Sequence, residues 1–137
     1  MNKWRICLIC LFGALQLSVS AAPKEKKENV EEPKRVYMYG VSIDFNDSTI
    51  YLTDVQYLDD ILINADGSIQ NYAGYSLQLK VYLEGTLGEM NQTCAVVYSD
   101  KKKKLEKRFI KTRKRYMSDK SKTVVPIGTD AFTFEKR

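Results

Sequence analysis

Histidine is absent from this chain of 137 residues, and cysteine and proline occur only three times each. Without histidine, catalysis by an imidazole base and metal sites built on imidazole ligands are excluded. Cys7 and Cys10 lie in an apolar segment near the N-terminus, so Cys94 is the one cysteine in the remainder of the chain. A single cysteine cannot form an internal disulfide, and packing therefore has to stabilise the fold.

Phosphate-cradling loops are also missing. The seven glycines form neither a dinucleotide-binding fingerprint nor a P-loop. Most nucleotide-dependent enzymes are thereby excluded, and we assign no cofactor, no metal and no catalytic residue. Cys94 is a conceivable nucleophile, but it lies in an apolar run, where a free cysteine normally packs as a small core residue.

The N-terminus has the order of a secretory signal. Two basic residues precede an apolar run over residues 6–17, and small residues follow it. This order predicts a signal peptide over residues 1–21, cleaved between Ala21 and Ala22. The apolar run is shorter than the roughly 20 residues that a membrane-spanning helix needs, so we expect no membrane-spanning segment in the mature chain. The expected location is exported, either periplasmic or secreted.

The mature chain divides into two parts. Residues 22–35 are mostly Lys, Glu, Pro and Asn, which is typical of a flexible charged tether. Residues 36–137 have the length and apolar content of one globular domain with its own core.

Hydrophobic periodicity predicts the elements of this domain. Alternation indicates a hairpin with strands over 36–45 and 49–57, and an apolar run indicates a third strand over 93–98. Helical spacing indicates helices over 71–84 and 101–117. Residues 123–127 and 131–135 supply further extended segments, the latter with Phe132 and Phe134 on one face. The fold class predicted is α/β (α+β), a single small domain with a mixed four- to five-stranded sheet and two amphipathic helices.

Charge is divided unevenly along the domain. Residues 36–99 contain eight acidic residues and one basic residue, whereas residues 100–122 contain twelve basic and three acidic residues. Such a division creates a field that steers partners towards one surface.

The helix expected over 101–117 is basic around most of its circumference. Four lysines at the start of a helix oppose its macrodipole, at a cost of about 0.3–1 kcal/mol each. We interpret this helix as a surface for an anionic envelope component or another protein; nucleic acid is not expected, because export separates the chain from it. The alternative is a solvated face that balances the acidic half of the molecule. The candidate binding residues are Lys101, Lys102, Lys103, Lys104, Arg108, Lys111, Arg113 and Arg115.

Asp54, Asp59 and Asp60 lie close together in sequence, near the end of the second expected strand. Paired carboxylates with different pKa values can perform general acid and base catalysis, so a carboxylate-dependent envelope hydrolase is one alternative. Acids that close a strand and enter a turn are the ordinary explanation. A third alternative is a self-associating structural protein. If the three aspartates lie on a surface opposite the basic helix, that acidic surface of one copy could contact the basic helix of the next.

The chain resembles a group of small exported proteins of Bacteroidota. The resemblance rests on the segments VYMYGV (36–41), FNDS (45–48), YLTDVQ (51–56) and YSLQL (75–79), together with the basic helix and a terminal FTF. It implies an exported, compact domain and no catalytic residues. Some members carry an enoyl-reductase label, which this sequence does not support, because it is too short for that fold and lacks the nucleotide-binding glycines. We therefore predict a non-enzymatic binding module of the bacterial envelope.

Overall fold

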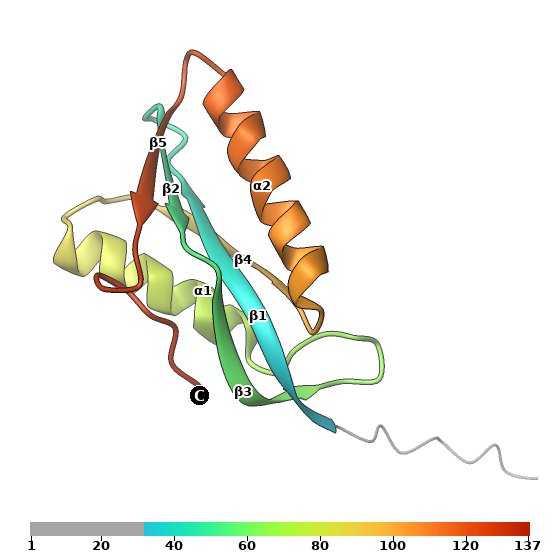
Figure 1. Ribbon diagram of the computed structural model, residues 1–137. Coiled ribbons are helices and arrows are strands. Elements are labelled where there is room, and N and C mark those ends of the chain that lie inside the picture. The colour runs from blue at the N-terminus through green and yellow to red at the C-terminus, as the bar shows by residue number, and fades with distance from the viewer. Residues whose placement is uncertain (1–31) are drawn as a thin grey trace, which may run out of the picture.

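Alternating apolar side chains build the central strand of the sheet in the computed structural model, which describes residues 32–137 (Figure 1). The five strands are β1 (Glu32–Ile43), β2 (Thr49–Thr53), β3 (Gln56–Ile63), β4 (Thr93–Ser99) and β5 (Thr123–Ile127). Together with two α-helices they form one small mixed α/β domain, so the predicted fold class is confirmed.

β1 pairs along both of its edges. β4 runs antiparallel to it on one edge, while β2 and β3 share the other edge and β5 extends the sheet by pairing in parallel with β2. Between the stretches of β1 that pair with β2 and with β3, the backbone N–H of Gly40 donates to Thr53 Oγ1 over 2.8 Å. β3, β4 and β5 each pair with a single strand, so each of the three has an outer edge.

The helices cover opposite faces of the sheet (Figure 1). α1 (Tyr72–Val81) continues into the π-helical turn η1 (Tyr82–Thr86), and both pack on the face that carries Val36 and Met38. α2 (Lys102–Ser118) packs through Leu105 on the other face, against Tyr39. Because successive side chains of a strand point to opposite faces, β1 is buried from both sides.

Gly40 sets how closely α1 approaches the sheet. A Cβ at this position would lie 2.5 Å from Leu79 Cδ2 and 3.1 Å from Phe134 Cζ. The absent side chain therefore makes room for fully buried Leu79 of α1.

The extended segment expected over residues 131–135 joins no strand of the sheet. Phe132 and Phe134 are nevertheless buried in the α1-side core, as their shared face indicated. Side-chain amides replace the missing strand partner: Gln56 and Gln78 hydrogen-bond to the backbone of this segment.

The domain also begins earlier than expected. β1 starts at Glu32, so the last four residues of the predicted tether are strand residues, because their backbone pairs with β3. Phe45, the last residue of the first expected strand, lies beyond the end of β1 and is 83% exposed. The predicted signal peptide (1–21), its cleavage site at Ala21 and Ala22, and the rest of the tether lie outside the described residues.

Neither α-helix begins with a side-chain cap. Asn71 occupies the N-cap position of α1 in a left-handed conformation, but its side chain forms no capping hydrogen bond. α2 begins after Lys101, whose own N–H donates to Ser99 Oγ over 3.1 Å. Within residues 32–137, no helix has the length and apolar character required to cross a membrane.

Candidate functional site

α2 is held to the sheet by one narrow stripe of side chains. Leu105 is fully buried, and the ring of Phe109 meets that of Tyr39 edge-on with centroids 5.2 Å apart. One turn further on, the hydroxyl groups of Thr112 and Tyr39 are hydrogen-bonded at 3.0 Å. These contacts fix the orientation of the helix and leave the rest of its circumference to solvent.

Every basic candidate of α2 is exposed, as the sequence predicted. Among the described residues, the one ion pair of this helix joins Lys102 Nζ to Glu106 Oε1 at 3.8 Å. No other Lys or Arg of α2 has a described carboxylate within ion-pair distance. The helix thus presents positive charge that residues 32–137 do not neutralise.

Four of these residues form a single line, which we call the basic row: Lys104, Arg108, Lys111 and Arg115. Their spacing of four, three and four residues places them on one face of the helix. At 1.5 Å per residue the row is about 17 Å long. Lys101 precedes the helix, and Lys102, Lys103 and Arg113 lie on other faces.

The basic row borders a hollow along the outer edge of β4, which we call the β4 groove. Its larger part has a volume of about 670 Å³ and lies between Tyr72, Tyr98 and Arg108. A second part of about 370 Å³ shares Gly67 and Tyr98 with the first and includes Lys104. One wall therefore comes from the start of α1 and the turn before it, and the other comes from α2.

The three acidic candidates do not assemble into a site. Asp59 pairs with Arg35 at 2.5 Å, and hydrogen bonding by that guanidinium lowers the pKa of Asp59. Asp54 lines a small cavity of about 180 Å³ together with Arg113 of α2, and Asp60 is exposed with a left-handed backbone. The expectation that Asp54 lies on a surface opposite the basic helix is therefore wrong. No group of three potential metal ligands occurs within residues 32–137.

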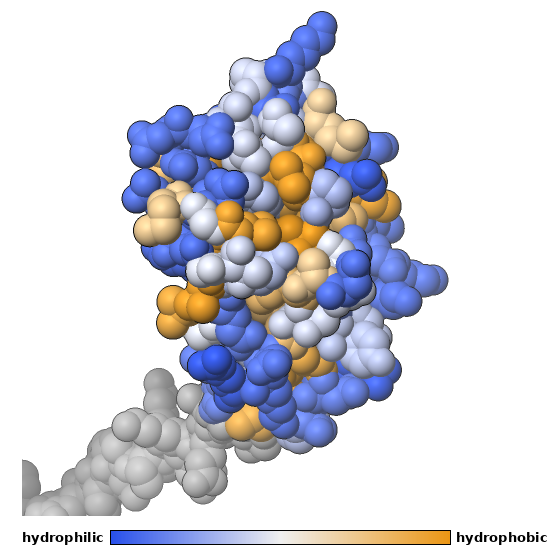
Figure 2. All heavy atoms as spheres, turned by 90° about the vertical axis from the view of Figure 1, so that its left-hand side faces the viewer, coloured by the Kyte–Doolittle hydropathy of each residue, from blue (hydrophilic) through white to orange (hydrophobic). Residues whose placement is uncertain are grey.

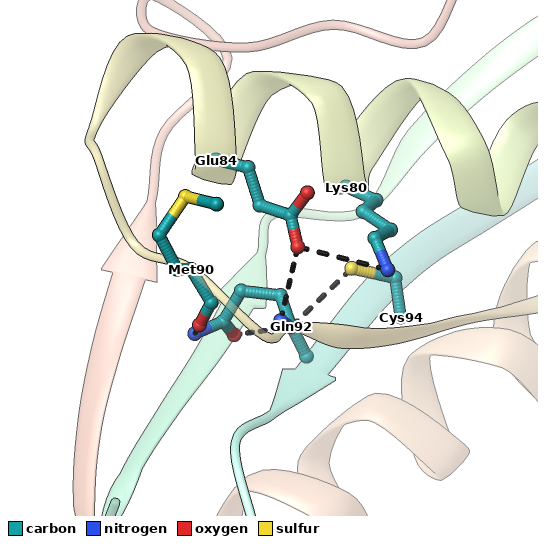
Figure 3. Close-up of polar contacts among 6 residues, drawn as sticks. Lys80, Glu84, Met90, Gln92 and Cys94 are labelled. Atoms are coloured by element: carbon teal, nitrogen blue, oxygen red, sulfur yellow. Dashed lines mark hydrogen bonds and ion pairs between the residues drawn. The ribbon is translucent and has the colours of Figure 1, made fainter.

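Cys94 belongs to a polar cluster beneath the end of α1 (Figure 3). Its thiol donates to Ser42 Oγ at 3.3 Å, and that hydroxyl donates to Gln92 Oε1 at 2.6 Å. The carboxylate of Glu84 accepts from the Gln92 backbone N–H and lies 3.6 Å from Lys80 Nζ. Burial raises the pKa of the Cys94 thiol, which keeps it protonated and supports an inert packing role.

The opposite side of the molecule differs in character. Figure 2 shows the side on which α1 lies, where apolar side chains gather among polar ones. Leu77 and Val81 of α1 are 56% and 60% exposed. Exposed apolar side chains occur on both helices, since Ile110 and Met117 of α2 are 52% and 61% exposed, whereas the dense positive charge is confined to α2.

Comparison with protein-family models, with curated proteins and with solved structures finds no match for this chain. The site therefore has to be interpreted from its own geometry.

Sequence reasoning found the basic helix but missed the β4 groove. The groove forms because β4 lies at an edge of the sheet and because the turn over residues 64–67 lies close to that edge. Neither arrangement can be predicted from the local pattern of apolar and polar residues. Tyr72 shares the helical spacing of buried Tyr75 and Leu79, yet it is 40% exposed and lines the groove.

Proposed function

We propose that the mature protein is an exported, non-enzymatic binding module of the bacterial envelope that captures an anionic partner through α2. The observation that carries this proposal is the exposure of the basic row without a described carboxylate partner. The partner is not a nucleic acid, because export separates the protein from it.

The cost of this charge supports a binding role. Lys104 and Arg108, and likewise Lys111 and Arg115, are like-charged pairs four residues apart, each destabilising a helix by about 0.2–0.5 kcal/mol. Packing of α2 depends on Leu105, Phe109 and Thr112 and does not require these charges. A partner that neutralises the row would relieve the repulsion.

Two alternatives receive less support. A carboxylate-dependent hydrolase needs acids that converge, whereas Asp54 follows β2 and lines a cavity with Arg113, and Asp59 of β3 is paired with Arg35. Self-association needs a complementary acidic face, and Asp59 is already paired with Arg35.

The test measures binding of labelled poly-L-aspartate and of vesicles rich in an anionic phospholipid at low salt. The triple substitution Lys104→Glu, Arg108→Glu and Lys111→Glu should abolish binding, because it reverses the charge of three of the four residues of the basic row. A matched control, Lys120→Glu, Lys136→Glu and Arg137→Glu, makes the same change in net charge elsewhere and should retain binding. Absence of wild-type binding to both probes, or equal loss in both variants, would contradict the proposal.

A further inference from the structure

The outer edge of β4 has unused hydrogen-bonding groups. In an antiparallel pair, alternate residues direct their N–H and C=O groups away from the partner strand. The Val96 N–H points away from β1, since it donates to the Tyr72 hydroxyl at 3.3 Å. The N–H groups of Cys94 and Tyr98 therefore point to the same edge, and neither has a hydrogen-bond acceptor within residues 32–137.

The outer edge of β5 is protected in a way that the outer edge of β4 is not. The Thr123 N–H donates to Ser48 and the Ile127 carbonyl accepts from Asp54, so odd-numbered residues of β5 face β2. Pro126 consequently lies on the outward side, where it removes a donor. Proline at such a position is a recognised means of preventing an additional strand from pairing.

The β4 groove surrounds this open edge with two chemically different walls. Tyr72 and Tyr98 have ring centroids 5.9 Å apart and form an aromatic wall on the α1 side. Arg108 and Lys104 form a basic wall on the α2 side, with Asp100 as the acidic residue lining the far end. An extended segment lying in this groove would have one face against each wall.

We infer that β4 accepts an extended acidic segment of a partner protein as an additional strand. This inference rests on the proposed function and specifies its partner. Because side chains of a strand alternate, apolar residues of the segment would contact Tyr72 and Tyr98, while acidic residues would contact Arg108 and Lys104. Charge complementarity supports this occupant, since neither Arg108 nor Lys104 has an ion-pair partner among the described residues.

Tyr72 occupies the place of the incoming strand. Its hydroxyl accepts the hydrogen bond that a carbonyl of the partner would take from Val96. Binding must break this contact, so Tyr72→Phe, which removes the competing acceptor and retains the ring, should tighten binding about 2- to 10-fold. Weaker binding by this variant would contradict the role assigned to the hydroxyl.

The decisive experiment uses synthetic peptides of alternating Glu and Val, about eight residues long, as a strand of ordinary length requires. One version is unmodified, a second is N-methylated at every Glu and a third at every Val. N-methylation removes the donors on one edge of a strand and leaves those on the other. One of the two methylated peptides should bind at least about tenfold more weakly than the other, because only one of them loses the donors that face β4.

The outcomes separate this inference from the proposed function. Equal affinities of the two methylated peptides, or failure of the unmodified peptide to bind while poly-L-aspartate binds, would overturn strand addition and leave anionic binding intact. Failure of every anionic probe would overturn both. A dimer of the free protein that excludes the peptide, seen by light scattering, would assign the edge to a second copy and also overturn the inference.

Discussion

The side-chain amide of Gln56 pairs with the backbone on either side of Thr133 in the way that a neighbouring strand would. Its Oε1 accepts the Phe134 N–H at 2.8 Å, and its Nε2 donates to the Phe132 carbonyl at 3.0 Å. Gln78 of α1 makes the equivalent pair of bonds with Glu135, both at 2.8 Å. Two glutamines thus hold the C-terminal segment over the α1-side core.

Removal of the Gln56 amide should be costly because both of its hydrogen bonds are buried. We expect Gln56→Ala to lower the free energy of unfolding by about 1–3 kcal/mol, since backbone groups of Phe132 and Phe134 lose their partner. Denaturant unfolding measures the change. Gln78→Ala is the matched control, and its more exposed bonds should contribute less; an equal or larger loss there would contradict this account.

A methyl group at Gly40 should collide with the core. Gly40→Ala places a Cβ 2.5 Å from Leu79 Cδ2, and overpacking of this kind costs about 1–3 kcal/mol. In combination with Leu79→Ala, which removes the colliding atom, the Gly40→Ala change should cost less than it does alone. Strictly additive free energies of unfolding for the two substitutions would show that the collision is not the cause.

The lysines at the start of α2 should oppose stability while supporting binding. Lys103→Glu with Lys104→Glu should raise the free energy of unfolding by about 0.3–1 kcal/mol per residue, because acidic residues suit a helix N-terminus. The same variant should bind poly-L-aspartate more weakly. Lys114→Glu with Arg115→Glu, near the other end, should weaken binding and lower stability. A change of the same sign in the free energy of unfolding of both variants would contradict the expected interaction with the helix dipole.

The Cys94 thiol should react slowly in the native protein. Its pKa is raised by burial, so less thiolate is present at neutral pH than in an unfolded chain. A disulfide-exchange reagent should react quickly in denaturant and slowly without it, and the native rate should increase as the pH rises. A raised folded-state pKa also means that stability falls as the pH rises through the ordinary thiol pKa. Rapid native reaction at neutral pH would exclude an inert role.

Periodicity predicted most of the fold because the elements are strongly patterned. The alternation around Tyr39 and the spacing of Tyr75, Leu79 and Leu83 placed a central strand and a helix correctly. The helix over 101–117 was correct to within one residue at each end, since its stripe around Leu105 is narrow and its other residues are polar.

The features that could not be predicted depend on contacts between residues that are far apart in the sequence. The start of β1 at Glu32 requires β3 as its partner, and the C-terminal segment relies on amides 78 and 57 residues away along the chain. Acids that are close in sequence have different partners in the structure. The Asp59 carboxylate pairs with Arg35, whereas the Asp54 backbone N–H donates to the carbonyl of Ile127 at the end of β5. The basic helix was visible from composition, whereas the groove beside it required the order of the strands.

The salt dependence of binding tests the central claim most directly. Affinity for poly-L-aspartate should fall steeply between ~50 mM and ~300 mM salt, because exposed charges are screened over this range. The dependence of affinity on salt concentration should become shallow for the variant with Lys104, Arg108 and Lys111 changed to Glu. An affinity that does not respond to salt, or a slope that the triple variant leaves unchanged, would contradict a binding role for the exposed charges of α2.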